Sequence, residues 1–126
     1  MRKNIFLRLI LQKKTLNDYL NHLNPEQKQA VEQIDGPMIV IAGAGSGKTR
    51  VLTYRIAHLI KNGINPFNTL SLTFTNKASK EMRDRIQNII GNNDAENIWM
   101  GTFHSVFSKI LRIESHYINY PKNYTI

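Results

Sequence analysis

Residues 42–49, with the sequence AGAGSGKT, constrain the fold of this chain more than any other segment. An apolar run at residues 38–41 precedes them, and apolar residues with helical spacing follow them. This strand–loop–helix order is typical of a phosphate-binding P-loop (Walker A), because small residues let backbone N–H groups converge on an anion at a helix N-terminus. Lys48 is expected to reach the β- and γ-phosphates, and Thr49 to hold Mg²⁺ through its hydroxyl. The sequence therefore predicts a nucleoside triphosphate site.

One position departs from the strict P-loop pattern, which begins with glycine where this chain has Ala42. Alanine fits there if the backbone is not left-handed. A chance glycine-rich turn is the alternative. The preceding strand, the Gly-Lys-Thr sequence and the following helix all argue against it.

Composition sets the broad class of protein. The chain has 126 residues, enough for one modest core, and 41% hydrophobic residues, which is ordinary for a globular domain. It has no cysteine, which excludes disulfides, thiolate metal sites and thiol nucleophiles. No apolar run reaches transmembrane length, and Lys13 and Lys14 stand where a signal-peptide cleavage site would be. We expect a cytoplasmic protein with no membrane partner.

The net charge of +8 suggests nucleic acid as a partner, but its distribution weakens that argument. Residues 1–14 carry five basic side chains and no acidic one, whereas the rest of the chain carries 12 basic and 9 acidic side chains. We assign residues 1–19 to a basic N-terminal extension. Such an extension either binds a polyanion or is simply solvated, and the sequence favours the second.

Periodicity predicts helices alternating with strands. Asn24 is expected to cap a helix at residues 25–34, and further helices are expected at 48–62, at 77–90 and after Thr102. Strands are expected at residues 38–42, 70–74 and 98–101. This alternation predicts an α/β fold with a partial parallel sheet flanked by helices.

A P-loop enzyme also needs a carboxylate after a later apolar strand, to hold Mg²⁺ and position water. None of the nine acidic residues follows an apolar run that is not already assigned. We therefore expect the chain to be the front part of an enzyme.

Four segments resemble motifs of one family. Residues 23–31 resemble the Q motif, residues 42–50 motif I, residues 72–78 motif Ia and residues 101–105 motif Ib of the UvrD/Rep/PcrA group of superfamily 1 DNA helicases. Alanine is usual at the first position of that motif I. The four motifs occur in the family's order and cover the chain from about residue 20 to its end.

The resemblance implies an ATP-dependent 3′-to-5′ DNA helicase or translocase that couples ATP hydrolysis to movement on single-stranded DNA and to unwinding. Residues 20–126 would be the N-terminal part of its first RecA-like domain, a P-loop NTPase fold, with the Walker B strand and the second motor domain absent. ATP and Mg²⁺ would be the cofactors. Single-stranded and duplex-junction DNA and the remainder of the helicase chain would be the partners. The 126 residues alone are expected to be inactive.

The resemblance also implies roles for individual residues. Lys48 and Thr49 would be catalytic, with Thr49 on Mg²⁺, and Gln27 would read the adenine. The nucleotide-binding set is Gln27, Ala42, Gly43, Ala44, Gly45, Ser46, Gly47, Lys48, Thr49 and Arg50. The DNA-binding set is Phe74, Thr75, Asn76, Thr102, Phe103 and His104.

Simpler interpretations remain open from the residues alone. Gln27 fits a helix capping box, and Phe74 and Phe103 fit core aromatics. Trp99 fits the core better than a base stack, and the basic residues of the 77–90 helix fit a solvated face first. For the whole chain, the alternatives are a non-catalytic ATP- and DNA-binding module and the helicase part of a nuclease–helicase subunit. A small nucleotide kinase is disfavoured, because no segment resembles a lid.

Overall fold

A computed structural model describes residues 18–91, 93–121 and 123. The element order over these residues is η1 (Asp18–His22), α2 (Pro25–Glu32), α3 (Lys48–Lys61), η2 (Pro66–Asn68), β1 (Leu70–Thr73), α4 (Asn76–Ile90), η3 (Asn93–Asn97), β2 (Trp99–Thr102), α5 (Phe103–Glu114) and η4 (Ser115–Ile118). Most of the predicted basic extension, residues 1–17, lies outside the described residues. Its last two residues begin η1.

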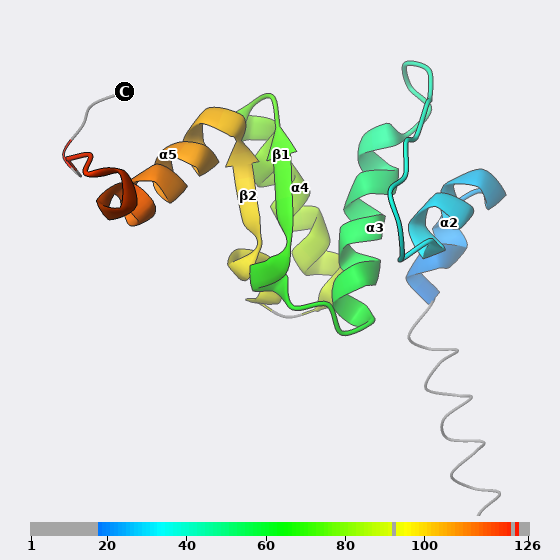
Figure 1. Cartoon of the computed structure of the whole chain (residues 1–126). Helices are drawn as coiled ribbons and strands as arrows, with labels where there is room; N and C mark the ends of the chain where they lie inside the picture. Colours follow the sequence, from blue (N-terminus) through cyan, green and yellow to red (C-terminus); the bar gives the residue numbers. More distant parts are fainter. Residues whose placement is uncertain (1–17, 92, 122, 124–126) are drawn as a thin grey trace, which may run out of the picture.

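The two strands form a small parallel sheet. Leu70 pairs with Trp99 and the register runs to Thr73 opposite Thr102. Helix α4 connects the strands and lies behind them in Figure 1, while α3 stands between α4 and α2. The prediction of an α/β fold with a small parallel sheet flanked by helices is confirmed.

Two hydrophobic clusters hold these elements together, and α3 contributes to both. The larger one joins α3, α4, η3 and β2 and consists of Ile56, Ala57, Met82, Ile86, Ala95, Ile98 and Met100. The smaller one joins η1, α2 and α3 and consists of Leu20, Val31 and Val51. Burial on two sides of one helix makes α3 the link between the sheet and α2.

The helices predicted at 25–34, 48–62 and 77–90 are confirmed to within two residues at each end, and the helix predicted after Thr102 begins at Phe103. Asn24 caps α2, because its side chain accepts a hydrogen bond from Gln27 N. Thr102 caps α5 in the same way, accepting from Ser105 N at 3.2 Å. Gly91 ends α4 with a φ of 74°, a left-handed conformation that favours glycine.

The strands predicted at 70–74 and 98–101 are confirmed within one residue, but the strand predicted at residues 38–42 is wrong. That segment has no sheet neighbour among the described residues, and Ile39 and Ile41 are 88% and 94% exposed. Val40 instead faces α3, where it lines a cavity with Val51 and Leu52. A strand exists only through hydrogen bonds to a neighbour, so an apolar run with none does not become one.

Candidate functional site

The glycine-rich loop, residues 42–47, folds back on itself just before α3. Ser46 donates two hydrogen bonds to Gly43 O, from its backbone N at 3.4 Å and from Oγ at 2.6 Å. Gly45 and Gly47 have φ values of 75° and 88°, which side-chain-bearing residues rarely adopt. Among the described residues that are not glycine, Asn119 alone has a positive φ, so Ala42 has a negative one. This is the condition under which alanine fits the first position of the loop.

Lys48 is the first residue of α3, and its side chain folds back to hydrogen-bond with the start of the loop. Its Nζ donates to Ala42 O at 2.8 Å and to Gly43 O at 2.7 Å. The ammonium group therefore lies within the turn, beside the N-terminus of a helix of 14 residues. A helix N-terminus and an ammonium group both attract anions, so both features favour an anion at this position.

Thr49 is exposed in the first turn of α3, next to Lys48. Its backbone carbonyl accepts from Thr53 Oγ1 at 2.7 Å, a contact inside the helix. A hydroxyl is a hard oxygen donor of the kind that Mg²⁺ accepts together with water and phosphate oxygens. The chemistry of Thr49 thus fits its predicted role.

Gln27 joins α2 to the glycine-rich loop. Its Oε1 accepts from Asn24 N at 3.2 Å, which completes the capping box, and its Nε2 donates to Ser46 O at 3.0 Å. A Cβ at Gly47 would lie 2.8 Å from Gln27 Nε2. The capping interpretation of Gln27 is therefore correct, and the amide makes a second contact, to the loop, that helix-capping rules do not predict.

A cavity of about 240 Å³ lies between α2 and the loop. It brings together four residues of the predicted nucleotide-binding set, namely Gln27, Ala42, Ser46 and Lys48. Arg50 does not line it. The Arg50 guanidinium lies 5.6 Å from the centroid of the Tyr54 ring, farther along α3. A larger cavity, about 490 Å³, lies beside β2 and α5, away from this loop.

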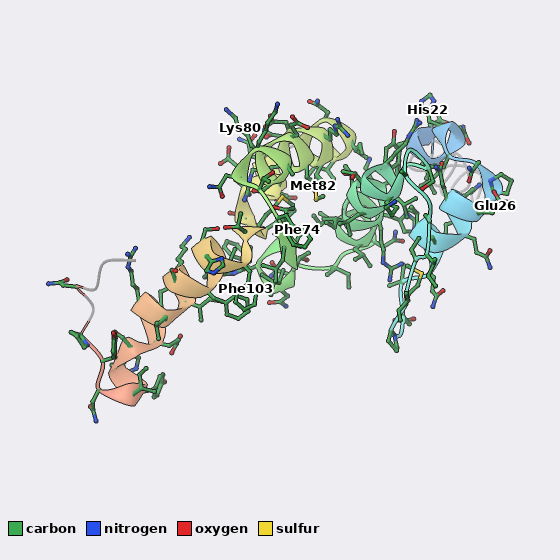
Figure 2. The ribbon with its side chains drawn as sticks, turned by 90° about the horizontal axis from the view of Figure 1, so that it is seen from above. His22, Glu26, Phe74, Lys80, Met82 and Phe103 are labelled. Atoms are coloured by element: carbon green, nitrogen blue, oxygen red, sulfur yellow. The ribbon has the colours of Figure 1, made fainter. Side chains whose placement is uncertain are left out.

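The predicted DNA-binding residues gather at a second place, here called the strand-end site. Its members, Phe74, Thr75, Asn76, Thr102, Phe103 and His104, follow or end the two strands at the same edge of the sheet. Phe74 is fully exposed and Phe103 is 56% exposed, so neither is a core aromatic. Figure 2 shows both at this end of the sheet, well apart from Glu26, which lines the cavity beside the loop.

The hydroxyls of the strand-end site serve as helix caps. Thr75 Oγ1 accepts from Ala78 N at 3.1 Å, as Thr102 does for α5. Asn76 is the first residue of α4, and the His104 ring meets the edge of the Phe103 ring with centroids 6.0 Å apart. Two helix N-termini therefore point to the edge that carries two exposed aromatic rings. This combination suits phosphate and base contacts.

The basic residues of α4 divide into two kinds. Lys77, Lys80 and Arg85 are exposed, as expected for a solvated face. Arg83 instead donates to Ala95 O in η3 at 2.5 Å and to Met100 O in β2 at 3.2 Å. Trp99 is half-buried, with Lys109 Nζ 5.1 Å from its ring centroid.

Sequence reasoning missed a polar contact that anchors η1. Tyr19 Oη and His58 Nδ1 lie 2.6 Å apart, and Lys61 Nζ lies 4.8 Å from the Tyr19 ring centroid. Burial, with a contribution from the Glu32 carboxylate, raises the pKa of Tyr19 to about 12. Burial lowers the pKa of His58, with Glu32 opposing and Arg55 adding to the shift. Nothing in the local sequence pairs residues 39 positions apart.

Within the part of the chain that the structure describes, we find no helix with both the length and the apolar character needed to cross a membrane.

Comparison with known proteins covers most of the chain. Residues 23–126 match the model of the UvrD/REP helicase N-terminal domain. The protein named ATP-dependent DNA helicase PcrA of Staphylococcus aureus is 51% identical over 112 residues, which are 88% of this chain and 15% of that protein. The protein of the same name from Staphylococcus epidermidis is 47% identical over the same shares. The chain thus spans about 15% of the length of these relatives. With a family match over residues 23–126, this chain belongs to the UvrD/REP helicase N-terminal domain family.

Proposed function

We propose that this chain is the ATP-binding and strand-contacting portion of an ATP-dependent 3′-to-5′ DNA helicase. The observation that carries the proposal is the Gln27 bridge, which joins the segment resembling the Q motif to the glycine-rich loop. The names of the relatives, ATP-dependent DNA helicase PcrA, support it. Residues 20–126 would form the front of a RecA-like domain, and the remainder of a helicase chain would supply the Walker B carboxylate and the second motor domain.

The glycine-rich loop would act as a P-loop. Lys48 would exchange its two carbonyl partners, Ala42 O and Gly43 O, for phosphate oxygens, which bind an ammonium group more strongly because they are charged. Residues 42–47 would supply backbone N–H groups, and Thr49 would hold Mg²⁺, which supplies charge neutralisation at the phosphates. Arg50 would approach the nucleotide only by leaving Tyr54.

Gln27 would face the adenine from α2. An amide side chain both donates and accepts, as the edge of adenine requires, and its two atoms can each take a further partner beside Asn24 and Ser46. The nucleotide would then lie between α2 and the loop, where the 240 Å³ cavity is.

The strand-end site would bind single-stranded DNA. Exposed aromatic rings give stacking platforms that tolerate any base, worth about 1–3 kcal/mol per base. The N-termini of α4 and α5 would face the phosphates. In Figure 1 the carboxyl ends of both strands and the first turns of α3 and α4 lie at one end of the molecule, which favours one ligand-binding face.

A binding experiment on the full 126-residue chain tests the DNA contact. The measurement is the fluorescence anisotropy of a labelled single-stranded oligonucleotide of mixed sequence, with wild type, Phe74→Ala and Phe67→Ala compared. Phe67 is the matched control, an exposed phenylalanine in η2, before the other end of β1. We expect Phe74→Ala to weaken binding by about 1–3 kcal/mol and Phe67→Ala to leave it unchanged. Equal affinities of all three proteins would argue against the strand-end site.

A further inference from the structure

Phe103 and Phe107 form a stacked aromatic pair on α5. Their ring centroids are 4.3 Å apart and the ring planes are inclined by 21°. Residues four apart share one face of a helix, so the pair follows from the sequence spacing once α5 forms. Phe107 thus covers part of the Phe103 ring, while more than half of the Phe103 side chain remains exposed.

The pair stands outside the hydrophobic clusters. Val106 is the buried residue of α5, whereas Phe107 is 40% exposed. The Phe103 ring contacts two other rings, stacking on Phe107 and making an edge contact with His104. The orientation of the exposed Phe103 ring therefore depends on these two neighbours, of which Phe107 lies closer, more than on the core.

We propose that Phe107 is a positioning residue for Phe103 within the strand-end site, an inference that rests on the proposed DNA-binding function of that site. An exposed ring that changes rotamers freely must be ordered when a base stacks on it, and this costs affinity. A ring already held by a stack loses less freedom. Phe107 then raises the affinity for single-stranded DNA without touching the strand.

Substitutions at Phe107 show whether its effect requires an aromatic ring or only an apolar side chain. On the full chain, with the same anisotropy measurement, we expect Phe107→Ala to weaken binding about threefold to tenfold. Phe107→Leu, which is apolar but has no ring, should weaken it similarly, and Phe107→Tyr should keep the wild-type affinity. Leu111→Ala is the matched control, because Leu111 lies one turn farther along α5 and is 36% exposed. Circular dichroism of each variant reports whether α5 is retained.

A double-mutant cycle tests the positioning role directly. In a Phe103→Ala background, Phe107→Ala should cause no further loss of affinity, because there is no ring left to hold. An undiminished loss in that background, or wild-type affinity of Phe107→Leu, would overturn the proposal. If Phe103→Ala weakens binding while Phe107→Ala does not, the role of Phe107 is wrong and the strand-end site stands. If Phe103→Ala itself has no effect, Phe103 is no base contact and the role of Phe107 fails with it, while the comparison of Phe74→Ala with Phe67→Ala still tests the strand-end site.

Discussion

Thr73 and Thr102 are register partners at the carboxyl ends of the two parallel strands, and each is followed directly by an exposed phenylalanine. Parallel pairing without an offset brings the residues after each strand to the same edge. Thr73 Oγ1 also hydrogen-bonds to Thr75 O at 3.0 Å and to Gly101 O at 3.4 Å, which links the two strand ends. Two chain segments 29 positions apart, as Thr73 and Thr102 are, thereby form one surface.

The caps at this edge can be tested through stability. Thr75→Ala removes the acceptor for Ala78 N at the start of α4, so the free energy of unfolding should fall by about 1 kcal/mol. Thr75→Ser keeps a hydroxyl and should lose much less. Urea unfolding followed by circular dichroism measures both, and equal losses for the two variants would show that the cap bond is not what Thr75 contributes.

The contact between the loop and α2 predicts an asymmetry between two glycines. Gly47→Ala places a Cβ 2.8 Å from Gln27 Nε2 at a φ of 88°, whereas Gly36→Ala has a similar φ of 81° and no atom within 4 Å. In each variant the left-handed backbone should lower the free energy of unfolding by about 1–2 kcal/mol. The loss should be larger for Gly47→Ala, because Gln27 must also move. Thermal unfolding compares them, and Gln27→Ala added to Gly47→Ala should recover part of the difference. A larger loss for Gly36→Ala would contradict this account of the loop.

Gln27→Glu separates the two contacts of this side chain. The carboxylate keeps an acceptor for Asn24 N but has no donor for Ser46 O, so the cap of α2 should survive while the tie to the loop is lost. We expect the free energy of unfolding to stay near the wild-type value, because the cap of α2 is kept. Binding of an ATP analogue should be weaker, and the preference for ATP over GTP in a competition measurement should be smaller. Gln27→Ala should lose both. An unchanged ATP-over-GTP preference in Gln27→Glu would exclude the proposed adenine contact.

The Tyr19–His58 contact predicts how stability changes with pH. Because burial lowers the pKa of His58, the unfolded chain binds the proton more tightly, so stability is fully present above pH 6.5 and falls as the pH drops below it. Because the pKa of Tyr19 is raised to about 12, stability is present below pH 10 and falls as the pH rises from 10 towards 12.

Unfolding midpoints measured across this range check both directions. His58→Gln should flatten the acid side and Tyr19→Phe the alkaline side. His22→Gln, at an exposed histidine of η1, is the matched control for the acid side. An acid loss that persists in His58→Gln would assign that loss to other groups.

Local signals predicted much of this structure. The cap at Asn24 and the apolar spacing within each helix act between neighbouring residues, so the sequence shows them directly. The two short strands and their shared edge also followed from alternation of helices and strands. The sequence did not decide whether Phe74 and Phe103 lie in the core or on the surface. Residue spacing alone does not show whether other elements pack over the end of a strand.

Contacts between residues far apart in the sequence were not predicted. The segment 38–42 has the composition of a buried strand, but whether it becomes one depends on a neighbour that the composition does not reveal. The bond from Gln27 to Ser46, that from Tyr19 to His58 and that from Arg83 to Met100 join residues that pack together only after folding. Their partners have no signature in the local pattern.

The most direct test of the central claim is the affinity of the full chain for a fluorescent ATP analogue with Mg²⁺, measured for wild type, Lys48→Ala and Lys80→Ala. Lys80 is the matched control, an exposed lysine on α4. The account predicts saturable binding that Lys48→Ala abolishes or weakens at least about tenfold, roughly 1.4 kcal/mol, and that Lys80→Ala leaves unchanged. No saturable binding by the folded wild-type chain, or equal affinities of all three proteins, would contradict it.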